Sequence, residues 1–123
     1  MPDVFRRFAL FDVVVNNADR KSGHCLLGRD GVVWGIDHGV CFHEEPKLRT
    51  VIWDFAGEPV EASSVSELSD LARKLDSTTL REELLSLIDE KELEALRERL
   101  LGLLEAGRYP EPGLARPFPW PLI

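Results

Sequence analysis

The sequence predicts an α+β domain that is mostly helical and has one short β-hairpin in its first third. Three observations predict this class. The second half of the chain has three apolar stripes at helical spacing, each behind a capping signal. Asp30-Gly31 separates two short apolar runs, which is typical of a hairpin. The length of 123 residues suits one domain.

The first element that we expect is a helix over residues 3–15. Apolar side chains recur there near helical spacing, although the run 13–15 suits a strand equally well. Asn16 and Asn17 both favour turns and left-handed backbone, so the element should end at them. Residues 16–23 then form a polar loop.

The hairpin is predicted from residues 24–28 and 32–37. The second run is strongly apolar and favours a buried strand, with Trp34 in the core. Residues 40–62 have no clear period, so we expect a long loop with a short ordered piece around Trp53, which we also place in the core. Long irregular segments in compact domains are often functional.

The second half predicts three helices between residues 63 and 107. Three pairs have the spacing of a capping box: Ser64 with Glu67, Thr79 with Glu82, and Asp89 with Glu92. A leucine-rich stripe follows each pair. Gly107 is the expected C-terminal cap, and residues 108–123 form a Pro-rich tail.

Charge and composition exclude several classes of protein. Residues 1–60 carry 7 basic and 9 acidic residues, and residues 61–123 carry 8 and 13, so most of the net charge of −7 belongs to the helical half. This balance argues against nucleic acid as a partner. No signal peptide or membrane span is visible, and two cysteines make no disulfide framework, which predicts a cytoplasmic protein.

Two acidic residues stand on two loops with the hairpin between them. Asp19 suits a catalytic base that orients an attacking hydroxyl. Asp37, at the end of the apolar strand, suits a ligand of a hard divalent cation. Taken singly, each has a simpler reading: Asp19 forms a surface ion pair with Arg20, and Asp37 is a turn residue. Together they have the layout of a phosphoryl-transfer site.

This pattern resembles a known family. The stretch 12–20 (Asp-Val-Val-Val-Asn-Asn-Ala-Asp-Arg), followed by Ile36-Asp37-His38-Gly39, is similar to the C-terminal lobe of the phosphatidylinositol 3- and 4-kinase-like family. Within it, the type II phosphatidylinositol 4-kinases and small related bacterial proteins resemble it most. Residues 11–26, 36–53 and 105–112 also resemble an actinobacterial family of uncharacterised kinase-like proteins.

The resemblance implies roles for single residues. Asp19 matches the catalytic Asp, with Asn17 and Arg20 supporting its loop, and Asp12 matches a structural Asp of the preceding helix. Asp37 matches the metal-binding Asp. His24 stands where these kinases have a metal-binding Asn, which is a departure. The implied cofactors are ATP and Mg²⁺ or Mn²⁺, held by Asp37 and His24.

The resemblance also implies an architecture. The chain would be one kinase-like large lobe: residues 1–62 with the catalytic loop, hairpin and activation-type segment, 63–107 with three helices, and 108–123 as the tail. No residues before Asp12 match the glycine-rich loop and strand lysine of a small lobe. A homodimer or a protein partner would then complete the cleft, with Leu101 as one contact. The phosphoryl acceptor stays unknown.

Two other readings stay open. The chain is alternatively a non-catalytic kinase-like module that binds a nucleotide or a protein. It is alternatively a small zinc domain, because all its histidines and cysteines lie between residues 24 and 43: His24, Cys25, His38, Cys41 and His43. Lys47 and Arg49 lie in the activation-type segment, where they either contact an acidic group of the acceptor or face solvent.

Overall fold

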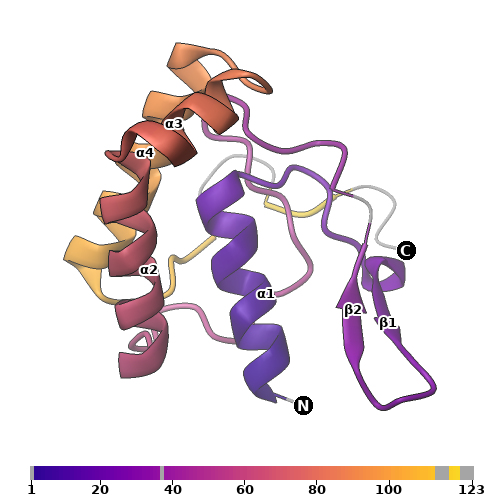
Figure 1. The fold of residues 1–123 in the computed structure, drawn as a ribbon. Helices are drawn as coiled ribbons and strands as arrows, with labels where there is room; N and C mark the ends of the chain where they lie inside the picture. The colour runs from indigo at the N-terminus through magenta and orange to yellow at the C-terminus, as the bar shows by residue number, and fades with distance from the viewer. Residues whose placement is uncertain (1, 37, 113–116, 120–123) are drawn as a thin grey trace.

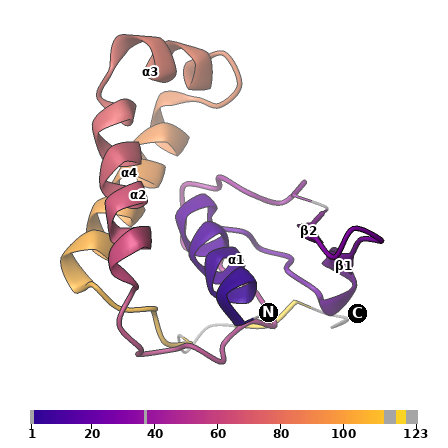
Figure 2. The same cartoon turned by 60° about the horizontal axis from the view of Figure 1, so that its bottom comes forward.

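The computed structural model describes residues 2–36, 38–112 and 117–119 and has the predicted α+β class. Helix α1 lies between the helical group α2–α4 and the β-hairpin in both ribbon views (Figure 1, Figure 2). The elements in these ranges are α1 (Pro2–Val15), the 3₁₀ helix η1 (Ser22–His24), β1 (Cys25–Leu27), β2 (Val33–Gly35), α2 (Ala62–Leu75), α3 (Thr78–Leu85) and α4 (Glu90–Ala106).

Helix α1 confirms the helical interpretation of the first segment. It ends where the paired asparagines begin, and Asn16 has a φ of 57°. Asparagine tolerates this left-handed conformation better than most residues. The chain therefore turns sharply at Asn16 and carries Asp19 back along the helix.

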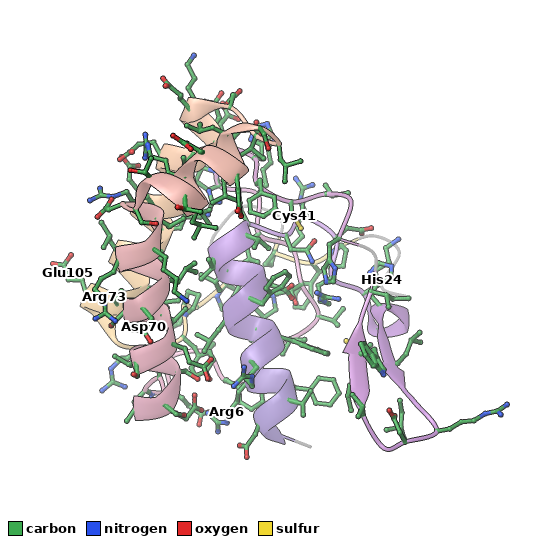
Figure 3. All side chains as sticks on the ribbon, in the orientation of Figure 1. Arg6, His24, Cys41, Asp70, Arg73 and Glu105 are labelled. Atoms are coloured by element: carbon green, nitrogen blue, oxygen red, sulfur yellow. The ribbon has the colours of Figure 1, made fainter. Side chains whose placement is uncertain are left out.

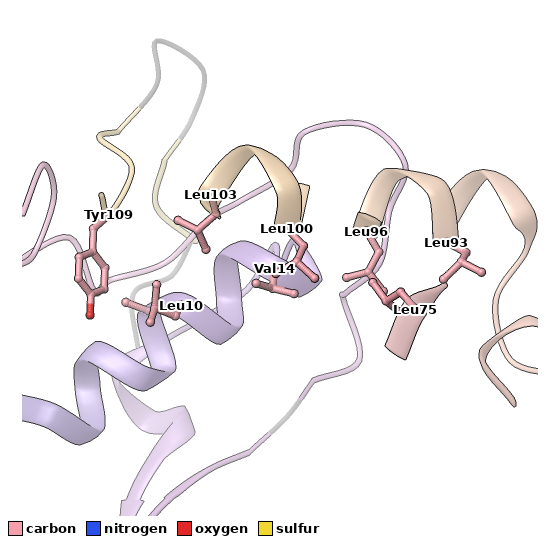
Figure 4. Close-up of a cluster of buried hydrophobic side chains, with 9 residues drawn as sticks. Leu10, Val14, Leu75, Leu93, Leu96, Leu100, Leu103 and Tyr109 are labelled. Carbon is pink, nitrogen blue, oxygen red and sulfur yellow. The ribbon is translucent and has the colours of Figure 1, made fainter. Parts of the chain in front are cut away.

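The core lies between one face of α1 and the apolar stripe of α4. Leu100 is fully buried, and Leu10 and Val14 of α1 are 5% exposed (Figure 4). The stripe repeats every three or four residues, so a single face of α4 supplies four of the nine buried residues of this core. The other buried members are Ala9, Leu75, Leu93, Leu96, Leu103 and Tyr109.

One of the three predicted capping boxes is confirmed. Asp89 accepts a hydrogen bond from the backbone of Glu92, and the Glu92 side chain accepts one from Asp89. Ser64 and Thr79 lie inside α2 and α3, so these two predictions are wrong. The start of α2 is set by tertiary contacts, because its N-cap Glu61 binds residues from both ends of the chain.

The predicted hairpin is present, but its predicted burial is wrong. Leu26 pairs with Trp34 in an antiparallel register, and Trp34 is 56% exposed. Two strands bury little by themselves, and among the described residues no other element adds a strand to this sheet. The hairpin meets α1 closely at Gly35, where a Cβ would lie 3.3 Å from the Phe8 ring.

The long segment between the hairpin and α2 is irregular, as predicted, but it is well anchored. Residues 38–61, all of which are described, contain no helix or strand. Single bridges join Thr50 to Arg20 and Pro59 to Arg108. Trp53 is half-buried, and its indole donates to the carbonyl of Pro117. No helix among the described residues is both long and apolar enough to cross a membrane.

Candidate functional site

A buried ion pair lies at the centre of the candidate site. Arg20 and Asp12 both have fully buried side chains. Arg20 Nε donates to Asp12 Oδ2 at 3.0 Å, and Arg20 Nη2 donates to Asp12 Oδ1 at 2.9 Å, a fork geometry that gives strong and specific pairs. The alternative of a surface ion pair between Asp19 and Arg20 is therefore wrong.

The guanidinium of Arg20 also binds both sides of position 37. Arg20 Nη1 donates to the carbonyl of Ile36 at 3.2 Å, and Arg20 Nη2 lies 2.9 Å from His38 Nε2. Asp37 itself, the predicted metal ligand, lies outside the described residues. The residues that flank it are thus tied through one arginine to the helix that precedes the Asp19 loop.

Asn17 holds the backbone of that loop. Its side chain is fully buried, and its amide donates to Asp12 Oδ1 at 3.1 Å. Its Oδ1 accepts from the backbone N–H of Asp19 at 3.0 Å. Asn17 therefore links the buried ion pair directly to the residue predicted as the catalytic base, which is the geometry of a loop support.

Asp19 is the partly exposed carboxylate of this loop. Its side chain is 31% exposed, and Lys21 Nζ lies 3.7 Å from its Oδ1. This is a loose ion pair at the surface, so the carboxylate stays accessible to a hydroxyl or a metal. Its position is set by the backbone beneath it, because its own N–H is fixed by Asn17.

His24 lies against the same loop from the side of the hairpin (Figure 3). Its Nδ1 is 2.9 Å from the carbonyl oxygen of Asp19 and 3.2 Å from the backbone nitrogen of Lys21. Both contacts use Nδ1, so this nitrogen of the ring faces the backbone of the Asp19 loop. These two contacts hold the His24 ring against the backbone of the Asp19 loop.

The zinc interpretation gains no support from the described residues. Within them, no three histidine, cysteine or acidic side chains gather closely enough to hold a metal ion. His43 Nδ1 accepts from the backbone of Glu45 instead. Cys25 and Cys41 are half-buried free thiols, and burial raises the pKa of both.

Thr50 is a site residue that no pattern in the sequence predicted. It is 2% exposed, and its hydroxyl lies 3.5 Å from Asp12 Oδ2 while accepting from the backbone of Ile52. Thr50 comes from the irregular segment, thirty-eight positions after Asp12. A lone threonine without periodic neighbours carries no sequence signal, so only the fold shows this contact.

An open hollow of about 570 Å³ lies beside the Asp19 loop, between η1, β1 and the irregular segment. Its lining is mostly apolar, and Asp54 is the charged residue among the lining residues. An acidic, apolar wall does not suit phosphate groups. The lining residues are Phe5, Ser22, Cys25, Val51, Ile52, Asp54 and Phe55.

Comparisons with known proteins give two relatives. The chain is 48% identical over 116 residues to Protein Rv2133c of Mycobacterium tuberculosis, which covers 94% of this chain and 41% of that protein. It is 31% identical over 87 residues to Phosphatidylinositol 4-kinase gamma 3 of Arabidopsis thaliana, which covers 64% of this chain and 15% of the plant protein.

The chain spans less than half the length of either relative. No family model and no solved structure matches it. The chain is thus similar along nearly its whole length to part of a mycobacterial protein, and more distantly to a short part of a plant phosphatidylinositol 4-kinase.

Proposed function

We propose that this chain forms the ATP- and metal-binding part of a kinase-like phosphotransferase. One observation carries the proposal: Arg20, buried on Asp12, contacts Ile36 and His38 on either side of position 37. The two acidic loops that the sequence separates are thereby tied to one buried centre. The name of the plant relative supports this class of chemistry.

In this proposal each residue has one task. Asp19 orients the hydroxyl of the acceptor and accepts its proton. Asp37 and His24 hold Mg²⁺ or Mn²⁺, and the ion neutralises the phosphates of ATP when it is bound. Arg20 and Asn17 keep the loop in place through buried contacts. A carboxylate suits Mg²⁺, whereas an imidazole ligand shifts the preference toward softer ions such as Mn²⁺.

The acceptor is not fixed by this geometry. A lipid, a protein and a small molecule all present hydroxyl groups, and the kinase-like class alone does not choose among them. The two relatives are matched over only part of their length, so their similarity to this chain does not choose an acceptor either.

Calorimetric titration of ATP with Mg²⁺ or Mn²⁺ tests the proposal. We expect metal-dependent binding by the chain, strongly weakened in Asp37→Asn, because that change removes the charge that holds the ion. Asp70→Asn is the matched control, since Asp70 projects from α2 on the far side of the molecule from His24 (Figure 3). A bound nucleotide should also raise the melting temperature.

Two results would count against the proposal. Absence of binding at millimolar nucleotide would remove the nucleotide site from this chain. Equal weakening by Asp37→Asn and Asp70→Asn would show a general charge effect instead of a metal site. The Mg²⁺ and Mn²⁺ titrations, run side by side, report which ion the site prefers.

A second candidate function is a non-catalytic module that binds a protein. It is favoured by the apolar surface of the hairpin, where large side chains lie open to solvent. Exposed apolar patches mark interaction sites in folded proteins, and Leu26 and Trp34, which pair across the two strands, lie on one face of this hairpin. The exposed residues of this surface are Leu26 at 46%, Leu27 at 65%, Val32 at 45%, Trp34 at 56% and Ile36 at 40%.

A further inference from the structure

Asn16 makes an unusually complete set of contacts to the irregular segment. It is 2% exposed, and its side-chain amide donates to the carbonyl oxygens of His43 and Glu45 at 2.9 and 2.6 Å. Its Oδ1 accepts from the backbone N–H of Lys47 at 2.9 Å. One buried side chain thus satisfies three backbone groups of a loop that has no secondary structure of its own.

Arg99 of α4 also binds this stretch. Its Nε donates to the carbonyl of Val14 at the end of α1, at 3.0 Å. Its Nη1 donates to the carbonyl of His43 at 3.2 Å, so Asn16 and Arg99 share one acceptor. The end of α1, the middle of α4 and residues 43–47 are therefore joined at a single point.

The chain on both sides of residues 43–47 also contacts the Asp19 loop. Ahead of residue 43, Ala18 N donates to the carbonyl of Val40 at 2.8 Å. Beyond residue 47, Arg49 N donates to the carbonyl of Asn17, and Arg20 N donates to the carbonyl of Arg49, both at 3.0 Å. Residues 40–49, which we call the belt, thus lie against the loop. Asn16 and Arg99 bind the middle of the belt.

We infer that Asn16 and Arg99 are positioning residues that keep the belt, and through it the Asp19 loop, in one arrangement. Asparagine is well suited to this place for two reasons. It tolerates the φ of 57°, and its amide can donate twice while its oxygen accepts once. Glycine at this position would keep the backbone conformation but lose the three side-chain hydrogen bonds. Aspartate would place a carboxylate against two carbonyl oxygens.

The effect that we expect on phosphoryl transfer rests on the proposed function. If Asp19 orients an acceptor, a loosened belt lowers the rate of phosphoryl transfer more than it lowers nucleotide affinity. The reason is that the belt supports the Asp19 loop, whereas the charge on position 37 is unchanged. Transfer to water, measured as phosphate release from Mg²⁺-ATP, reports this rate without a known acceptor.

Hydrogen–deuterium exchange of the full chain tests directly whether Asn16 and Arg99 hold residues 40–49 in place. In Asn16→Gly and Arg99→Gln, we expect the hydrogen-bonded amides of this stretch, those of Phe42, Lys47 and Arg49, to exchange at least about tenfold faster, because each variant loses side-chain hydrogen bonds that hold residues 43–47. The amides of α2 should keep their rates. Arg97→Gln is the matched control on the same helix, because Arg97 pairs with Asp76 at the surface.

Each outcome decides a separate question. Unchanged exchange of residues 40–49 in both variants would contradict the inference that Asn16 and Arg99 hold the belt. Equal acceleration of exchange throughout the chain would contradict it as well. A local acceleration with ATP affinity kept and phosphate release reduced would support the full inference. If the unaltered chain neither binds nor cleaves ATP, the proposed function fails, while the exchange data still decide whether Asn16 and Arg99 hold the belt.

Discussion

Arg20 shows how far apart sequence neighbours and structural partners can be. Its nearest acidic neighbour in the chain is Asp19, yet its partner is Asp12, eight positions earlier. The sharp turn at Asn16 reverses the chain and brings Arg20 back beside α1. Composition and spacing favoured the adjacent pair, and only the resemblance to kinase-like proteins assigned Asp12 a structural task.

The buried pair predicts a specific pattern of stability. Arg20→Met should lower the free energy of unfolding by about 3–5 kcal/mol, because it leaves the carboxylate of Asp12 buried without its partner. Lys21→Met is the control on the same loop, and its partly exposed pair with Asp19 is worth less than about 1 kcal/mol. Urea unfolding measures both.

The double variant Asp12→Leu with Arg20→Met completes this cycle. It removes both charges, so it should cost clearly less than the sum of the two single changes. Additive losses would show that the two side chains do not stabilise one another, which would contradict the central place given to this pair in the site.

The helices and the hairpin differ in how much of them was predictable. Periodic leucines predicted all three helices of the second half, since helical packing repeats locally in the sequence. Helix starts were less predictable: Ser64 has the right spacing for a cap but lies within α2. Burial of the hairpin was not predictable, because it depends on whether another element covers the apolar strand.

The exposed hairpin leads to a test at the level of this element. Trp34→Lys should cost less than about 1 kcal/mol, the size of a cross-strand pair, whereas Leu100→Ala in α4 should cost about 2–5 kcal/mol. Thermal unfolding compares the two. If the hairpin binds a second copy of the chain, sedimentation should also show self-association that Trp34→Lys abolishes. A large loss of stability in Trp34→Lys would contradict its exposure.

At the scale of the whole molecule, the sequence predicted the order of elements but not how the chain closes on itself. Residues 57–60 run beside residues 107–109, with Tyr109 N donating to the carbonyl of Glu58 at 2.9 Å. Arg6 from the start of α1 meets the same place, donating to Glu58 and Glu61. No spacing rule links residues this far apart.

The ionisation of Tyr109 makes the contact between residues 57–61 and residues 107–109 measurable. It is 3% exposed, and its hydroxyl donates to the carboxylate of Glu61 at 2.9 Å. Burial, together with that carboxylate, raises the pKa of Tyr109 from 10.0 to about 12. It is the single tyrosine of the chain, so ultraviolet absorbance follows its ionisation without interference from other phenols.

The direction of the stability change follows from this shift. Between pH 10 and 12 the unfolded chain has released the phenolic proton while the native chain still holds it, so the native state loses stability as the pH rises through this window. Tyr109→Phe should remove that part of the pH dependence, which urea unfolding of both proteins across the window measures. An absorbance midpoint near 10 in the native protein would mean that Tyr109 is neither buried nor bound to Glu61, which would contradict this contact between the two ends of the chain.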